Sequence, residues 1–173
     1  PIEWTADGWY RTKSTATPIK TDPSIKHGLS LSDDFEGPEP GLQWTFWKEY
    51  APQSLSFKKQ TLWIDAKGST PSDARLLLAT AEDKNYETQV EVNVGKGNTA
   101  GLLLYYSEKA YAGVVSDGKN FTIYRNAENS FTLPNKLGKR FLAKIQNQGN
   151  SVRIAVSKDG KEWTTLVENM DVS

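Results

Sequence analysis

YETQVEVNV, at residues 86–94, alternates along its whole length between residues suited to a core and residues suited to water. Every second residue from Tyr86 to Val94 lies on one face of an extended chain, whereas Glu87 and Glu91 lie on the opposite face. A period of two that is sustained over this length predicts a β-strand with one buried face. The stretch therefore predicts a sheet that covers a hydrophobic core.

Further strand candidates recur about every 8–14 residues on both sides of this stretch, separated by turn signals. They span residues 55–57, 61–65, 75–81, 100–106, 110–116, 121–125, 131–133, 140–146, 151–157 and 162–167. Asp117-Gly118 predicts a tight hairpin, and the apolar run at 100–106 predicts a central strand covered on both faces. A helical pattern is confined to a single turn at 41–46. The sequence predicts an all-β fold, which we interpret as a two-sheet antiparallel jelly-roll sandwich.

Composition divides the 173 residues into three parts. Residues 1–13 form a short segment that is rich in aromatic side chains. Residues 14–30 are polar and contain Pro18 and Pro23, which is typical of an extended linker. Residues 31–173 carry the dense strand pattern and are long enough to bury a core of their own.

Charge and composition exclude several functional classes. The chain has 21 Lys and Arg residues against 21 Asp and Glu residues, so it lacks the basic footprint of nucleic-acid binders and polybasic membrane patches. It contains no Cys and a single histidine, His27, which excludes thiolate chemistry and multi-histidine metal sites. We expect neither a nucleic-acid nor a membrane partner.

The cellular compartment stays open. The chain begins with Pro1 rather than Met, and residues 1–4 lack the charged and apolar regions of a signal peptide. We interpret this start as that of a fragment or a processed form. A periplasmic or secreted bacterial location is slightly favoured over a cytoplasmic one.

The carboxylates of the chain give only a weak indication of a catalytic or metal-binding site. Glu87 and Glu91 lie about 13 Å apart along one strand face, which is too far for a pair of catalytic carboxylates on their own. A solvated sheet face is the favoured interpretation, and we predict no catalytic residue. Asp33 and Asp34 offer hard oxygen ligands for a structural Ca²⁺, with turn capping as the favoured alternative. His27 lies in the predicted linker and is interpreted as a solvated residue.

Aromatic residues are the second candidate group. Trp44, Phe46, Trp47 and Tyr50 cluster within a stretch rich in Gly and Pro at 37–52. Aromatic planes stack on sugar rings, but large aromatics also fill the cores of all-β domains. Tyr105 and Tyr106 end the apolar run with their side chains on opposite faces. Four residues are candidates for carbohydrate binding or for an interface: Trp44, Trp47, Tyr50 and Tyr106.

Several stretches together resemble the C-terminal β-sandwich of family 43 glycoside hydrolases, the group of β-xylosidases and α-L-arabinofuranosidases. They are PIEWTADGW at 1–9, LSDDF at 31–35, GLQW at 41–44, RLLL at 75–78, AGLLLYY at 100–106 and YAGV at 111–114. The resemblance covers essentially the whole chain. It implies a concanavalin A-like sandwich that follows a five-bladed catalytic β-propeller.

The resemblance also implies where catalysis takes place. In that family, an Asp base, a Glu acid and a supporting Asp of the propeller perform an inverting hydrolysis, and their motifs are not present here. Residues 1–13 are similar to the last propeller strand, and residues 14–30 to the connection. The chain is therefore expected to be a non-catalytic accessory domain of a hemicellulose-degrading hydrolase, which packs on the propeller and shapes the substrate rim.

Two departures from the family pattern qualify this expectation. Many β-xylosidases of the group present an aromatic residue from the loop that corresponds to residues 93–99, and this loop contains none. An arabinofuranosidase-like or broader specificity therefore stays open. The family sandwich also continues past the equivalent of residues 170–172 with further strands, so we expect that this chain lacks its last strands and leaves a sheet edge unpaired.

Two alternative functions stay open beside the accessory role. The first is a carbohydrate-binding module that holds plant cell-wall oligosaccharides on surface aromatics. The second is a purely structural or oligomerising domain. No cofactor is expected apart from the structural Ca²⁺ at Asp33 and Asp34.

Overall fold

The computed structural model describes residues 2–12, 30–81, 83–127 and 129–173. The chain divides into two compact units, Pro1–Ser30 and Leu31–Ser173. Strands and turns make up the described residues of both units, which contain one short 3₁₀ turn and no α-helix. No helix among them is long and apolar enough to cross a membrane. The all-β prediction is confirmed.

The described part of the first unit is a small hairpin. Strand β1 (Ile2–Trp4) pairs with β2 (Tyr10–Thr12) in antiparallel register, with Trp4 opposite Tyr10. The Thr5 amide donates a hydrogen bond to the Trp9 carbonyl at 2.7 Å, which closes the turn. The predicted linker and His27 lie outside the described residues, apart from Ser30.

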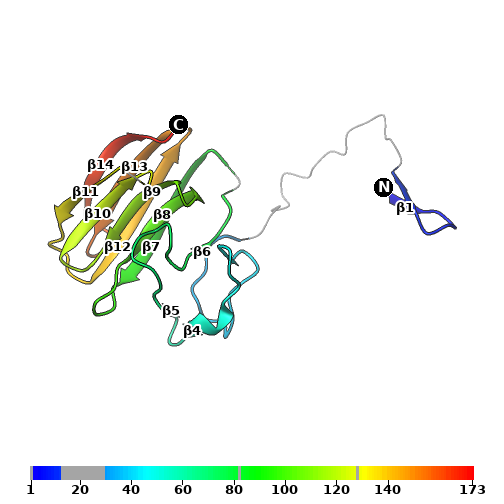
Figure 1. Ribbon diagram of the computed structural model, residues 1–173, viewed down its shortest axis with the longest axis horizontal. Coiled ribbons are helices and arrows are strands. Elements are labelled where there is room, and N and C mark those ends of the chain that lie inside the picture. Colours follow the sequence, from blue (N-terminus) through cyan, green and yellow to red (C-terminus); the bar gives the residue numbers. More distant parts are fainter. Residues whose placement is uncertain (1, 13–29, 82, 128) are drawn as a thin grey trace. The chain divides into compact units, whose positions relative to one another are not determined.

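Two four-stranded antiparallel sheets form the main part of the second unit (Figure 1). The first sheet has the order β11-β10-β9-β8 and contains β8 (Ala100–Ser107), β9 (Ala110–Ser116), β10 (Asn120–Arg125) and β11 (Asn129–Pro134). The second sheet has the order β14-β13-β12-β7 and contains β7 (Asn85–Asn93), β12 (Arg140–Gln148), β13 (Ser151–Ser157) and β14 (Trp163–Asp171). The predicted sandwich is therefore present.

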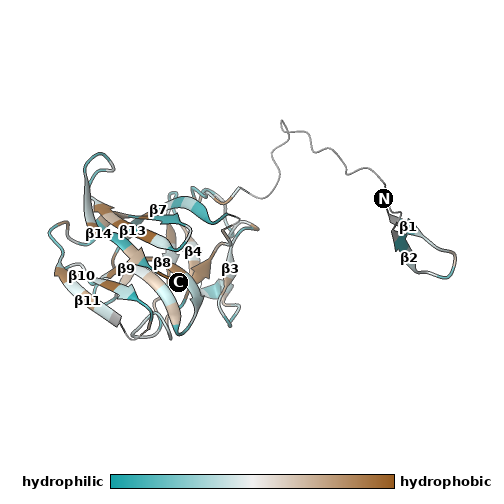
Figure 2. Ribbon diagram, turned by 90° about the horizontal axis from the view of Figure 1, so that it is seen from above, coloured by the Kyte–Doolittle hydropathy of each residue, from teal (hydrophilic) through white to brown (hydrophobic). Residues whose placement is uncertain are grey.

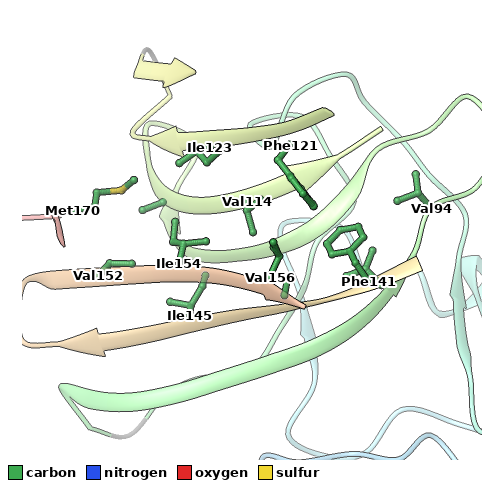
Figure 3. Packing of buried hydrophobic residues seen from close by; sticks show 13 residues of the cluster. Val94, Val114, Phe121, Ile123, Phe141, Ile145, Val152, Ile154, Val156 and Met170 are labelled. Carbon is green, nitrogen blue, oxygen red and sulfur yellow. The ribbon is translucent and has the colours of Figure 1, made fainter. Parts of the chain in front are cut away.

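The core lies between these sheets, and both supply side chains to it (Figure 3). Phe121 from β10 meets Phe141 from β12 edge to face, with ring centroids 5.1 Å apart. Val114, Ile123, Ile145 and related residues fill the space beside this pair. Hydrophobic and hydrophilic residues are intermixed along the strands (Figure 2), as expected for strands that bury one face. Burial of these apolar side chains is the main force that holds the sheets together.

The segment before β7 forms two small sheets and a 3₁₀ turn. Strand β3 (Thr45–Phe46) pairs with β6 (Leu77–Leu78), and β4 (Leu55–Phe57) pairs with β5 (Leu62–Ile64). The strands predicted at 55–57 and 61–65 are present as β4 and β5, whereas the strand predicted at 75–81 is reduced to the two residues of β6. The single helical turn predicted at 41–46 is wrong: a hydrogen bond from the Trp44 amide to the Gly41 carbonyl closes a simple turn there. The 3₁₀ turn η1 (Pro52–Ser54) lies further along the chain, where Pro52 starts it.

The prediction that residues 100–106 form a central strand is wrong. Strand β8 ends the first sheet and has a described partner, β9, on one side only. Its residues are mostly half-buried rather than fully buried. Leu102 and Leu104 pack on the core, and Tyr105 on the other face contacts Trp47. The strand is apolar on both faces because both faces are covered. Its sequence therefore does not distinguish an edge strand from a central one.

Strand β7 ends the second sheet in the same way, since β12 is its described partner. At the far side of that sheet, β14 pairs with β13 through two register shifts between Val152 and Ala155. Such irregularities twist an edge strand and discourage further pairing. Within the described residues, β7, β8, β11 and β14 each have a partner strand on one side only in these two sheets, and the expectation of further strands stays a prediction.

Candidate functional site

The Asp33 carboxylate accepts three hydrogen bonds at the start of the sandwich. One of its carboxylate oxygens accepts the Phe35 amide at 2.8 Å. The other accepts the indole nitrogen of Trp44 at 2.7 Å and the side-chain amide of Gln43 at 3.1 Å. The Phe35 ring stacks on Trp44 with centroids 6.0 Å apart. This geometry fixes the conformation of the chain where the sandwich begins, because one carboxylate accepts hydrogen bonds from three N–H groups.

The predicted calcium site gains no further ligand from this arrangement. Asp34 accepts a hydrogen bond from the Glu36 amide at 3.2 Å, which is a local turn contact. The described residues contain no group of three or more His, Cys, Asp or Glu side chains that could hold a metal ion. Calcium needs six to eight oxygen ligands, whereas N–H donors surround Asp33. Calcium binding at Asp33 and Asp34 stays a prediction.

Trp47 leads into a row of tyrosines on the outer face of the first sheet. Its ring lies edge to face with Tyr105 of β8, at a centroid distance of 5.2 Å. Tyr105 stacks on Tyr111 of β9 at 5.8 Å, and Tyr111 meets Tyr124 of β10 at 5.5 Å. The segment 44–76 therefore covers the outer face of β8 and β9 with aromatic contacts, which explains why both faces of β8 are apolar.

Ser72 adds hydrogen bonds between segment 44–76 and the strands that it covers. The Ser72 hydroxyl donates a hydrogen bond to the Glu108 carbonyl at 2.8 Å, and it shares a second one with the Tyr111 hydroxyl at 3.2 Å. The Trp47 amide donates to the Leu76 carbonyl at 3.4 Å. These bonds join three segments that are far apart in the sequence.

Two polar atoms in this region lack a described partner. The indole nitrogen of Trp47 and the hydroxyl of Tyr105 are both buried, and no described residue forms a hydrogen bond with either of them. Burial raises the pKa of the Tyr105 hydroxyl above its ordinary value. A buried polar group without a partner costs about 1–3 kcal/mol.

A pocket of about 120 Å³ lies beside Trp47. Phe46 and Trp47 supply its aromatic wall. Six charged side chains line it as well, three cationic and three acidic: Lys48, Lys67, Arg75, Glu49, Asp73 and Glu108. The pocket is thus polar and charge-balanced, with one aromatic side.

Exposed ion pairs connect these charges. Lys67 contacts Glu49 at 2.8 Å, and Lys48 contacts Glu108. The hydrogen bond from Lys67 holds the pKa of Glu49 below its usual value. Asp73 accepts the amide hydrogens of Thr70 and Ser69, which lower its pKa and fix the turn that leads to Arg75. Because exposed ion pairs contribute little stability, these side chains can change partners at small cost.

The four predicted binding residues do not form one cluster. Trp44 packs with Phe35, and Trp47 packs with the tyrosine row. Tyr50 is 77% exposed and touches Phe46 edge to face, while Tyr106 is 86% exposed on β8. Only Trp47 of the four lines the pocket.

Sequence reasoning missed the charged residues of this pocket. They come from three segments, at 46–49, 67–76 and 108, so no single window contains the site. The one local signal was the run Trp47-Lys48-Glu49, in which an aromatic residue stands beside an acid–base pair. Charged neighbours of that kind are common on any surface, so the signal was weak.

The acidic face of β7 is engaged in ion pairs. Glu87 contacts Lys144 at 2.8 Å and accepts a hydrogen bond from Gln146 at 2.7 Å. The hydrogen bonds from Lys144 and Gln146 hold the pKa of Glu87 below its ordinary value. Glu91 contacts Arg140 at 2.6 Å. A general acid of a glycosidase requires a raised pKa, which is the opposite of what this environment produces at Glu87.

Comparison with known proteins connects this architecture to a family. The model of the beta-xylosidase C-terminal concanavalin A-like domain matches residues 32–173. Among solved structures, the chain is similar to the GH43 protein BlXynB from Bacillus licheniformis, with 22% identity and a TM-score of 0.73. It is also similar to a xylan beta-1,4-xylosidase from Bacillus halodurans, with 18% identity and a TM-score of 0.69.

The chain corresponds to a part of each of these proteins. Each alignment covers 99% of this chain, but only 37% of BlXynB and 38% of the Bacillus halodurans enzyme. A xyloglucan-locus GH43B protein from Bacteroides ovatus aligns over 38% of its length, with 14% identity and a TM-score of 0.71. At these identities the likeness concerns the fold. A search among curated proteins gave no match.

Proposed function

The chain belongs to the family of beta-xylosidase C-terminal concanavalin A-like domains, and from this membership we propose that it serves a glycoside hydrolase by docking on its catalytic domain. The proposed partner is a β-propeller that carries the catalytic carboxylates. The sandwich contributes to the rim of the substrate site and performs no hydrolysis itself. The role concerns a protein longer than this chain, as the partial coverage of BlXynB supports.

The hairpin of residues 2–12 is the observation that carries this proposal. Trp4 and Trp9 are 76% and 73% exposed, and Tyr10 is exposed as well. An isolated two-stranded hairpin is only marginally stable in water, and adjacent exposed aromatics are typical of protein interfaces. A hairpin of this kind gains stability when a larger sheet covers its rings, which is what a propeller offers.

The state of the carboxylates supports a catalytic site elsewhere. Glu87 and Glu91 are paired with cations, and Asp33 is held by N–H donors. The hydrogen bonds from Lys144 and Gln146 lower the pKa of Glu87, whereas a general acid requires a raised pKa. We therefore expect pure chain of 173 residues to release no product from aryl xylosides or aryl arabinosides. Hydrolysis that co-purifies with the chain and survives further purification would overturn the proposal.

Docking is tested by mixing the chain with the catalytic domain of its parent enzyme. We expect a one-to-one complex in analytical ultracentrifugation. The double substitution Trp4→Ser and Trp9→Ser removes the exposed rings and should weaken the complex at least tenfold. Phe131→Ser is a matched control, because Phe131 is an exposed aromatic residue of β11 in the sandwich. Equal loss in both variants would contradict a docking role for the hairpin.

The turn at residues 94–99 is the proposed contribution to the substrate rim. The Asn98 amide donates to the Gly95 carbonyl at 3.2 Å, and Gly97 has a φ of 79°, so the turn is tight. It presents Lys96 instead of an aromatic side chain. In the parent enzyme, Lys96→Phe is expected to shift the ratio of kcat/KM values toward xylosides over arabinosides. An unchanged ratio would exclude this turn from the rim.

A further inference from the structure

We propose that the groove between β11 and β14 binds the C-terminal end of an extended peptide, which pairs with β11 and places its carboxylate beside Arg125. The proposal goes beyond docking on a catalytic domain, and neither role requires the other. The ligand is the free C-terminus of another protein, and it carries apolar residues at alternate positions. The groove lies entirely within the second unit of the chain.

The groove opens on the side of the sandwich where an edge strand of each sheet lies. Strands β11 and β14 are these edge strands, and they lie on the same side of the core (Figure 1). Residues of both strands line the groove, together with Arg125 at the end of β10. Its volume of about 590 Å³ is within the range of roughly 300–1,000 Å³ that is typical of ligand sites.

The floor of the groove is apolar. Phe131 lies opposite the fully buried Ile123 and therefore faces the core side of β11, but it stays 49% exposed. Val167 and Met170 of β14 pack on the core and line the same groove. An apolar side chain that covers Phe131 removes both surfaces from water, which favours binding.

The free edge of β11 supplies the backbone contacts. Its register with β10 is continuous, and no described strand pairs with its other side. The strand contains no charged residue that would discourage a further strand. The register of β14 is instead interrupted between Val167 and Met170, which disfavours pairing there. An incoming strand is therefore expected to add to β11, as in other cases of β-strand addition.

Arg125 sets the direction of the peptide. It lies two residues beyond Ile123 on β10 and therefore on the same face of the strand. No described residue forms an ion pair or a hydrogen bond with its guanidinium group. Arg125 pairs with Asn129, the first residue of β11, so a peptide antiparallel to β11 ends beside Arg125. A guanidinium group can bind the terminal carboxylate there with two parallel hydrogen bonds.

Asp171 limits the ligand to a single negative charge at this end of the groove. It lines the groove with Arg125, and its carboxylate accepts the Ser173 amide at 3.0 Å. A second carboxylate on the peptide would approach Asp171, and like charges repel. We therefore expect a free C-terminus that follows a neutral residue, rather than a run of acidic residues.

NMR spectroscopy of the whole chain, labelled with ¹⁵N, provides the test. The probe is the acetylated peptide Val-Thr-Val-Thr-Leu with a free carboxylate, whose apolar residues alternate so that they share one face. We expect saturable shifts of the Phe131 and Thr132 amide resonances with a dissociation constant on the order of 0.1 mM. Saturable shifts at β8 without any at β11 would place strand addition at the wrong edge and overturn the proposal.

Three further peptides test the reasons given for recognition. The C-terminal amide of the same sequence lacks the charge and should bind at least tenfold more weakly. Val-Thr-Pro-Thr-Leu lacks a central N–H, and Val-Thr-Val-Asp-Leu adds a second carboxylate. Each should bind at least fivefold more weakly than the parent peptide. If the amide binds as well as the acid, the groove does not recognise a C-terminus and the proposal is wrong.

Variants locate the site without a change in the core. Arg125→Gln should weaken the acid peptide at least tenfold and leave the affinity for the amide peptide unchanged. Arg140→Gln is the matched control, because Arg140 is an exposed arginine that pairs with Glu91 and lies outside the groove. The absence of any saturable shift up to 2 mM peptide, or an equal loss in both variants, would overturn the assignment.

Discussion

The ammonium group of Lys144 in β12 lies 4.2 Å from the centroid of the Trp163 ring in β14. Lys144 also contacts Glu87 of β7 at 2.8 Å, so one side chain joins three strands across the outer face of the second sheet. Its side chain is largely buried in this position. Partial desolvation strengthens a cation–π contact relative to an exposed one.

We expect Lys144→Gln to lower the free energy of unfolding by about 1–2 kcal/mol, because it removes the cation–π contact and the pairing with Glu87 together. Urea denaturation followed by far-UV circular dichroism measures this loss. Lys96→Gln, on the exposed turn between β7 and β8, should change the free energy by less than about 0.5 kcal/mol. A similar loss in both variants would show that Lys144 acts only through net charge.

The edge-to-face pair of Phe121 and Phe141 holds the two sheets together. Phe141→Leu keeps the site apolar but removes the ring, and should cost about 1–2 kcal/mol. A double-mutant cycle with Phe121→Leu should give a coupling energy of about 0.5–1.5 kcal/mol. Phe131→Leu, at a half-exposed ring of β11, serves as the control. Additive losses of Phe121 and Phe141 would mean that the two rings contribute independently.

The role of Asp33 can be separated from calcium binding. Asp33→Ala leaves the Trp44 indole without its acceptor and should cost about 1.5–3 kcal/mol, as expected for hydrogen bonds to a charged group. Asp34→Ala removes a single amide contact and should cost less than about 1 kcal/mol. Thermal unfolding is compared in EDTA and in calcium. A rise of Tm in calcium that both variants abolish would instead establish a cation site.

Acid should destabilise the fold through its turn aspartates. The amide hydrogens of Asn120 and Lys119 hold the pKa of Asp117 below its ordinary value, and those of Lys161 and Glu162 do the same for Asp159. A lowered folded-state pKa stabilises the protein above the unfolded value, near pH 4, and this contribution disappears as the pH falls through the folded value. Tm is therefore expected to be flat between pH 7 and pH 5 and to fall below about pH 4.

Conversion of these aspartates to asparagines isolates the effect. Asp117→Asn and Asp159→Asn keep the side-chain oxygen that caps the turn but no longer titrate. Each variant should have a lower Tm than the native chain at pH 7 and a shallower loss of Tm below pH 4. If the profiles of the variants remain parallel to that of the native chain, other carboxylates govern acid unfolding.

The open edge of β8 should make the isolated chain associate with itself at high concentration. This strand is long, apolar and free of proline, and such edges pair with other chains. Leu103→Lys places a charge at the edge and should abolish the association seen in sedimentation velocity. Thr132→Lys is the matched control, because it adds the same charge to β11 at the opposite edge of that sheet. A monomer at all concentrations would indicate that the edge of β8 is already protected.

Local patterns in the sequence predicted most of the strands. The alternation of residues 86–94 predicted β7, and Asp117-Gly118 predicted the β9–β10 turn, where Gly118 has a φ of 88°. These signals are local because side-chain period and turn conformation depend on adjacent residues. Strand order is not local, which is why residues 100–106 were wrongly assigned to the centre of a sheet.

The pocket beside Trp47 was unpredictable for a similar reason. Its residues come together only because segment 44–76 packs on Tyr105 and Tyr111. A tryptophan within a cluster of aromatics was enough to mark Trp47 as a candidate. It was not enough to distinguish Trp47 from Trp44, whose indole N–H donates a hydrogen bond to Asp33. The difference between the two lies in hydrogen-bond partners that sequence alone does not specify.

The strand pairings predict that folding proceeds through fast local steps and one slow step, the pairing of β7 with β12. Strands β8 to β11 pair with their neighbours along the chain, and so do β12 to β14. Strand β7 alone joins a strand remote in sequence within these two sheets, with Asn93 opposite Arg140 and Asn85 opposite Gln148. Because loop-closure entropy opposes distant contacts, we expect the two meanders to form as hairpins first. Docking of β7 on β12 then limits the folding rate and closes the core.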